Sequence, residues 1–143
     1  MVKTAKDNRS TNIWDSIYRQ WIWADHLRTY FGNALPEKEL DLSGDFTIEA
    51  YWIFMSLWYG ILFSVIEALK EIRVEVPEVQ KDIDQMYLIL KRYRNAVFHV
   101  QTGYWTEKWR RLVLDEASSE KIHKIHKRVG IFLLETLKMK GIK

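Results

Sequence analysis

The sequence contains no cysteine, and only two prolines and six glycines interrupt its 143 residues. The absence of cysteine excludes disulfide bonds and zinc–thiolate sites, and it is typical of proteins in the reducing cytoplasm. Apolar residues make up 48% of the chain, and with so few helix breakers they favour helices over a turn-rich β fold. We therefore expect a single all-α domain over residues 1–143, long enough to bury a core of its own.

Motifs that mark common enzyme classes are also missing. The sequence contains no Walker loop, no dinucleotide-binding fingerprint, no catalytic-serine signature and no internal repeat. Residues 1–9 are polar and lack the apolar stretch of a signal peptide, so we expect a flexible terminus there. His123 and His126 have a spacing that metal sites use, but cations surround them, and we interpret them as part of a basic surface stripe. We expect neither a metal nor a cofactor.

Apolar residues recur at helical spacing in several segments of the chain. Each segment is bounded by residues that start or stop helices, so its limits can be predicted. Together the segments predict an up-down bundle of four to five helices. The expected helices run from Ile13 to about Asn33, from Asp45 to about Arg73, over about twenty residues from Pro77, and from Ser118 or Ser119 to about Met139.

The second of these segments has an unusual centre, because Ala50 to Ile66 is a run of seventeen residues without a formal charge. A membrane span needs about 20 apolar residues, and this run also contains serines, tyrosines and tryptophans, so we interpret it as a buried helix of a soluble protein. A membrane protein is the alternative. A helix that is apolar on every side needs cover on every side. Because a small bundle covers only part of it, the sequence predicts a two-fold homodimer.

Charge is divided unevenly along the chain. Residues 1–90 carry 9 Lys/Arg and 14 Asp/Glu, a net charge of −5, whereas residues 91–143 carry 13 and 5, a net charge of +8. A basic half beside an acidic half suits a polyanion such as RNA at one end of the molecule. The alternative is an ordinary solvated surface of mixed charge.

The basic half begins at the end of the third expected helix, with the sequence RNAVFH over residues 94–99. Asn95 and His99 are four residues apart and share a helix face, so the amide can orient the imidazole while Arg94 projects beside them. A guanidinium offers a planar fork of donors to phosphate, and an imidazole titrates near neutral pH. These side chains therefore suit chemistry on a phosphate ester. The alternative is a helix end at which Arg94 and His99 cap carbonyls and form surface ion pairs.

The pattern Arg94-Asn95-x-x-x-His99 resembles the signature of HEPN domains, small all-α modules frequent in toxin–antitoxin and phage-defence systems. The resemblance implies a metal-independent endoribonuclease at a dimer interface, with Arg94, Asn95 and His99 as catalytic residues. It also implies a polar or acidic residue on the second helix near the motif, for which Glu67 is the first candidate and Ser64 the second. The alternative for Glu67 is a place at a solvated helix end.

One position departs from a known subgroup of that family. Members paired with a nucleotidyltransferase antitoxin often carry a tyrosine two residues after the histidine. Here Gln101 occupies that position, and the next tyrosine along the chain is Tyr104. The departure favours a stand-alone protein of phage defence or stress response, with any antitoxin partner unidentified.

Aromatic residues alternate with cations immediately after the motif. Stacking of bases on aromatic rings beside cations that bind phosphate is a common way to hold single-stranded RNA. Trp105 and Trp109 are one helical turn apart, and core packing is the alternative for them. The residues predicted to bind RNA are Lys91, Arg92, Tyr104, Lys108 and Arg111.

The sequence thus predicts a cytoplasmic, metal-independent endoribonuclease that cleaves single-stranded RNA through its 2′-hydroxyl. A non-catalytic module of the same fold, which binds RNA, a nucleotide or a protein, is the alternative.

Overall fold

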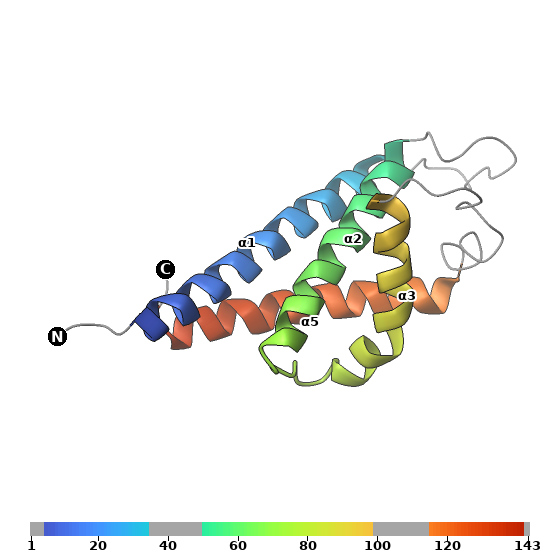
Figure 1. Ribbon diagram of the computed structural model, residues 1–143. Helices are drawn as coiled ribbons and strands as arrows, with labels where there is room; N and C mark the ends of the chain where they lie inside the picture. The colour runs from blue at the N-terminus through green and yellow to red at the C-terminus, as the bar shows by residue number, and fades with distance from the viewer. Residues whose placement is uncertain (1–4, 35–49, 99–114, 142–143) are drawn as a thin grey trace, which may run out of the picture.

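The computed structural model describes residues 5–34, 50–98 and 115–141 of the chain. Within these ranges the protein forms helices and no strand, so the predicted all-α class is confirmed. The helices are α1 (Ala5–Ala34), α2 (Ala50–Glu71), α3 (Gln80–Phe98) and α5 (Glu116–Met139) (Figure 1).

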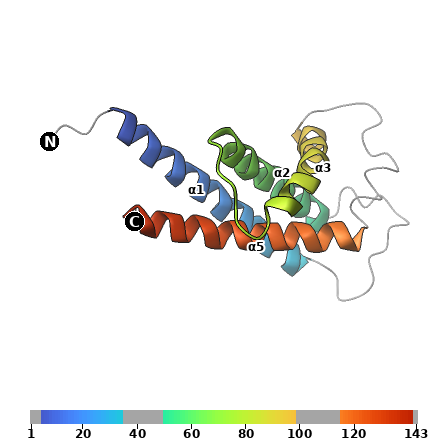
Figure 2. The same ribbon diagram turned by 90° about the horizontal axis from the view of Figure 1, so that it is seen from below.

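The helices pack around α2. In Figure 1, α1 and α3 lie on either side of α2 and run antiparallel to it, while α5 crosses beneath them. Figure 2 shows α5 running back along α1, so that the start of α1 and the end of α5 lie at the same end of the bundle. There the Lys140 ammonium lies 5.6 Å from the centre of the Trp14 ring. The first and last described helices of the bundle, α1 and α5, are therefore in contact with each other.

The charge-free centre of α2 is buried, as its composition predicts. Among the described helices, the segment Ile53–Glu71 of α2 has the length and composition of a membrane span, but more than half of it is buried inside the protein. Burial of each large apolar side chain contributes about 1.5–3 kcal/mol, so this helix supplies much of the stabilisation. Its buried apolar side chains are Met55, Trp58, Tyr59, Leu62, Phe63, Val65, Ile66 and Leu69.

Two helix starts differ from those predicted. The first helix begins at Ala5 rather than after Asn12, so residues 5–9 are helical, and residues 1–4 lie outside the described part. The last helix is capped by Asp115 rather than by a serine: its carboxylate accepts bonds from the Ala117 backbone N–H (3.3 Å) and from the Ser118 hydroxyl (2.7 Å). A carboxylate at the N-cap also faces the positive end of the helix dipole, which explains why Asp115 takes this position.

The third helix also starts later than predicted. Residues 77–79 form a turn, in which Glu78 has a positive φ of 72°, and α3 begins at Gln80. The side-chain oxygen of Gln80 accepts a bond from the Val76 N–H at 2.9 Å, which closes the turn. The regular helix therefore begins at Gln80, whose side chain accepts the bond from the Val76 N–H, and not at Pro77.

Helices α1 and α5 come into close contact at Gly130. The Trp21 indole lies directly against this glycine, and a Cβ added there would overlap the ring. From this position the indole Nε1 donates a hydrogen bond to the His126 backbone carbonyl at 2.9 Å. The absence of a side chain at Gly130 therefore sets the spacing of the two helices.

Two of the helical glycines, Gly130 and Gly32, should respond oppositely to alanine. Alanine is favoured over glycine within a helix by about 1 kcal/mol. Gly32 on α1 has open space around it, so Gly32→Ala should raise the free energy of unfolding by up to about 1 kcal/mol. Gly130→Ala should instead lower it by about 1–3 kcal/mol, because the methyl group must displace Trp21. Denaturant unfolding followed by circular dichroism measures both, and stabilisation of both variants would contradict the packing.

Candidate functional site

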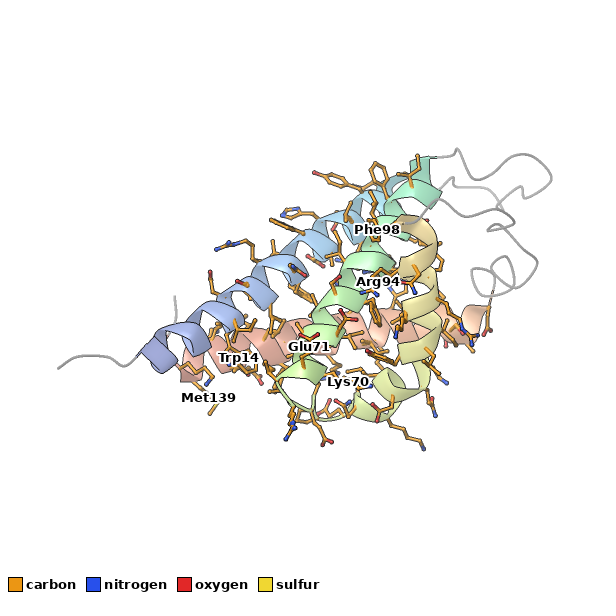
Figure 3. The ribbon with its side chains drawn as sticks, in the orientation of Figure 1. Trp14, Lys70, Glu71, Arg94, Phe98 and Met139 are labelled. Atoms are coloured by element: carbon orange, nitrogen blue, oxygen red, sulfur yellow. The ribbon has the colours of Figure 1, made fainter. Side chains whose placement is uncertain are left out.

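Residues 94–98, the described part of the predicted motif, lie at the end of α3 and pack against α2. Figure 3 shows Arg94 between α3 and α2, with Phe98 one turn further along α3. The Tyr93 hydroxyl anchors this end of the helix: the side chain is buried and lies 3.0 Å from the Ser56 hydroxyl of α2. The Phe98 ring rests on Gly60, although about half of its surface is exposed. The small residues Ser56 and Gly60 thus let α3 approach α2 closely.

The Arg94 guanidinium is held from two sides. Its Nη1 donates to both carboxylate oxygens of Glu67 at 3.3 Å, and its Nε and Nη2 donate to the Asn95 side-chain oxygen at 3.4 and 3.2 Å. Its carbon lies 4.6 Å from the centre of the Phe63 ring. The Arg94 and Glu67 side chains are 26% and 33% exposed, so water reaches the pair. These contacts fix the plane of the guanidinium without burying it.

Part of the guanidinium can still bind a ligand. A guanidinium carries five N–H groups, two of them on Nη2. Within the described residues, Nη2 uses one of its two N–H groups on Asn95. The second is available to an oxyanion that enters from solvent, which is the contact expected for a phosphate.

Glu67 lies where the sequence analysis expects an acidic residue, in contact with Arg94. Ser64, the second candidate, donates its hydroxyl to the Gly60 carbonyl of its own helix at 3.3 Å. The structure therefore brings Glu67, and not the Ser64 hydroxyl, to the guanidinium. The auxiliary catalytic role of either residue stays a prediction.

Several predicted site residues cannot be placed. His99, Tyr104, Lys108 and Arg111 lie outside the described residues, as do Trp105 and Trp109. Asn95 was expected to orient His99, and its amide oxygen is engaged by Arg94. The site is therefore described from one side only, by the surface that α2 and α3 present.

The predicted cations on α3 are at the surface. Lys91 and Arg92 are both exposed, one turn before Arg94 and Asn95. Exposed positions next to the guanidinium suit contacts with an RNA backbone, and that role stays a prediction.

The basic stripe expected on α5 is already paired in part with the acidic start of α3. Lys124 binds Asp82 at 3.0 Å, and Arg128 binds Glu78 at 3.2 Å. Lys121 donates to the Gln85 side chain at 3.0 Å. Two of the α5 cations are therefore neutralised where α5 meets α3 and the turn before it, which leaves this part of the face less suited to a polyanion than its sequence indicates.

His126 overturns the interpretation of the two histidines of α5 as a surface stripe. His126 is buried with 3% of its surface exposed, whereas His123 is exposed. The Trp58 indole donates to His126 Nδ1 at 3.1 Å, and Nε2 lies 2.9 Å from an Asp25 carboxylate oxygen. His126 follows Ile122 by four residues, on the apolar side of α5, and this register could have predicted its burial.

The pKa values of these groups follow from their surroundings. Burial lowers the pKa of His126 below its ordinary value, and Arg28 and His123 lower it further, against the opposing effect of Asp25. Partial burial of the His123 ring against Trp58 also lowers its pKa, again with a contribution from Arg28. Burial raises the pKa of Asp25, but its hydrogen bonds with His126 and Arg28 outweigh this and leave the pKa below its ordinary value. At neutral pH His126 is therefore uncharged and Asp25 is ionised.

Comparisons of the chain with family profiles, with curated proteins and with solved structures find no match. The HEPN resemblance therefore depends on the motif at residues 94–99 and on the order of the helices.

The contact between Arg94 and Glu67 should contribute little to stability. Partly exposed ion pairs contribute about 0–1 kcal/mol and are screened by salt. A double-mutant cycle of Arg94→Gln and Glu67→Gln should give a coupling free energy of about 0.5–1 kcal/mol that declines in 1 M salt. The more exposed Arg19–Asp15 pair of α1 is the matched control and should give less. A coupling free energy of several kcal/mol would contradict this and show that the pair contributes substantially to the stability of the fold.

Proposed function

We propose that this protein is a metal-independent endoribonuclease of the HEPN type, which cleaves single-stranded RNA through the 2′-hydroxyl. The observation that carries the proposal is the Arg94 guanidinium at the end of α3. It is fixed by Glu67 and Asn95, it is partly open to solvent, and it precedes His99 by five residues. A fixed guanidinium with an N–H group still available is suited to stabilise a charged phosphate.

The reaction uses only groups that the chain supplies. A base takes the proton of the 2′-hydroxyl, the oxygen attacks the adjacent phosphorus, and an acid protonates the departing 5′-oxygen. We assign the base and the acid to two copies of His99, because imidazole exchanges protons near neutral pH. Arg94 stabilises the negative charge that develops on the phosphorane. The products are a 2′,3′-cyclic phosphate and a 5′-hydroxyl.

This assignment requires a two-fold homodimer that places both motifs in one crevice. Apolar side chains are exposed at the end of the bundle where α2 begins and α3 ends: Ile53 is 48% exposed and Phe98 51%. The Tyr30 ring, also exposed, packs beside Phe54 at a centroid distance of 5.6 Å. Burial of such side chains against a second copy would be favourable, and the resulting interface would lie close to Arg94.

The cellular setting follows from the same proposal. A chain without cysteine suits the cytoplasm, where RNA is available. A stand-alone ribonuclease of phage defence or stress response fits Gln101 in place of a modifiable tyrosine, and any antitoxin partner is unidentified.

A non-catalytic binding module is the second candidate, and one contact favours it. The Glu67 carboxylate neutralises Arg94, as it would in a motif kept for packing between α2 and α3. In that case RNA would bind the protein without being cut.

Cleavage of single-stranded RNA in EDTA distinguishes the two candidates. The wild-type protein should produce 2′,3′-cyclic phosphate ends, and DNA of the same sequence should stay intact because it lacks the attacking hydroxyl. Arg94→Ala and His99→Ala should each lower the cleavage rate about 10²–10⁴-fold. Arg19→Ala, which removes an exposed arginine of α1, is the matched control and should leave the rate unchanged.

Circular dichroism and analytical ultracentrifugation would show that each variant keeps its fold and its dimer. Binding without cleavage by the wild-type protein would support the module. Cleavage that survives both Arg94→Ala and His99→Ala, or a protein that stays monomeric, would refute the proposed enzyme.

A further inference from the structure

A hydrogen-bonded chain with two buried members and one partly exposed carboxylate joins three helices away from the proposed site. It consists of Asp25 on α1, His126 on α5 and Trp58 on α2, linked at 2.9 Å and 3.1 Å. Trp58 is fully buried and His126 is 3% exposed. The chain connects α5 to both α1 and α2, beside the bond that the Trp21 indole of α1 donates to the His126 carbonyl.

The hydrogen bonds define the protonation state of His126. An indole N–H only donates, so His126 Nδ1 must accept and carries no proton. A neutral imidazole then has its proton on Nε2, which donates to the Asp25 carboxylate. Both ring nitrogens are thus satisfied only in this neutral form.

A second proton on His126 would break this arrangement. It would have to sit on Nδ1, facing the Trp58 N–H, so that two donors would oppose each other at a separation of 3.1 Å. Because Trp58 is fully buried, its N–H would have no water to bond instead.

The neighbouring charges act in both directions. Asp25 on α1 attracts an imidazolium, whereas Arg28 on α1 and His123 on α5 repel it. The α2 neighbour, Trp58, is uncharged and opposes the proton through its N–H. The attraction of Asp25 is shared with Arg28, which binds the same carboxylate oxygen at 3.0 Å. The balance therefore favours neutral His126.

We propose that His126 is an acid-sensitive latch: its neutral imidazole holds α5 on the α1–α2 pair, and its protonation releases α5. The latch is independent of RNA cleavage, because none of its groups touches Arg94. It makes the cohesion of the bundle depend on pH below the ordinary histidine pKa of 6.5.

The sign of the effect follows from the protonation states. The unfolded chain binds a proton on this histidine near its ordinary pKa of 6.5, whereas the folded protein binds it only at lower pH. The unfolded state therefore holds more protons below pH 6.5, and stability falls as the pH falls through that value. Asp25, with a pKa lowered from 3.8, does not contribute until the solution is more acidic than that. The lowered pKa of His123 acts in the same direction as that of His126.

The variant His126→Gln tests the latch. Glutamine offers one acceptor and one donor in place of the two ring nitrogens, and it does not titrate. As the pH is lowered below 6.5, the equilibrium constant of unfolding of the wild-type protein should rise. The rise should be up to about tenfold per pH unit for each proton that unfolding takes up. In His126→Gln, the number of protons taken up on unfolding should be lower by one, so the equilibrium constant should depend less steeply on pH. His26→Gln is the matched control, because His26 is exposed on α1 beside Asp25, and it should leave the dependence unchanged. His123→Gln separates the share of the second histidine.

A measurement on the wild-type protein makes the test independent of the variant's stability. Nitrogen NMR of the imidazoles at pH 7.5 should show His126 as the neutral Nε2–H tautomer, with a pKa below the ordinary value of 6.5. Hydrogen exchange, corrected for its intrinsic pH dependence, should show α5 losing protection before α2 as the pH falls. An Nδ1–H tautomer, a pKa at or above 6.5 for His126, or an unchanged pH dependence in a folded His126→Gln protein would overturn the latch.

Discussion

The structure depends on the need to shield α2 from water. Its buried face includes Trp58, Leu62 and Phe63, all fully inaccessible to solvent, and the other helices are arranged to cover it. Because cover is needed on almost every side, α1 and α3 flank α2 while α5 closes the bundle from beneath (Figure 2). The proposed functional surface lies where this cover ends, along the line at which α3 meets α2. The same burial that provides stability thus decides where polar chemistry can be placed.

Burial of α2 also requires partners for the polar groups that it carries inward. The Trp58 N–H is satisfied by His126 and the Ser56 hydroxyl by Tyr93, so both polar groups lie at helix contacts. A buried donor without a partner costs about 1–3 kcal/mol, and these bonds therefore select one register of α5 and of α3 over others. The register of α3 places Arg94 above Phe63 and opposite Glu67. The packing against α2 therefore determines both the position of Arg94 at the proposed site and the contacts of His126 in the proposed latch.

Helix class and most of the core could be predicted from periodicity, because a 3.6-residue repeat reports a buried side directly. Helix ends were less predictable: Asp115 and Gln80 start their helices through side-chain bonds that compete with equally plausible serine and proline signals nearby. The burial of His126 was missed because its sequence neighbours are cations, whereas its partners Asp25 and Trp58 come from distant helices. Glu67 was placed correctly beside Arg94 in space only through a resemblance, since no local pattern links residues twenty-seven positions apart.

The ion pair between Arg94 and Glu67 bears on both candidate functions, and its strength decides what it implies. Were the pair buried, removal of Glu67 from Arg94 by a phosphate would leave an unpaired charge and cost several kcal/mol. Here both side chains are reached by water and the distances are 3.3 Å, so the pair contributes about 0–1 kcal/mol. The charge-assisted bonds between a phosphate and the guanidinium contribute more free energy than the ion pair with Glu67. Because Glu67 and Asn95 hold the guanidinium in one orientation beforehand, less side-chain entropy is lost when the phosphate arrives. For the proposed ribonuclease, the contact would orient Arg94 for an oxyanion without preventing its binding.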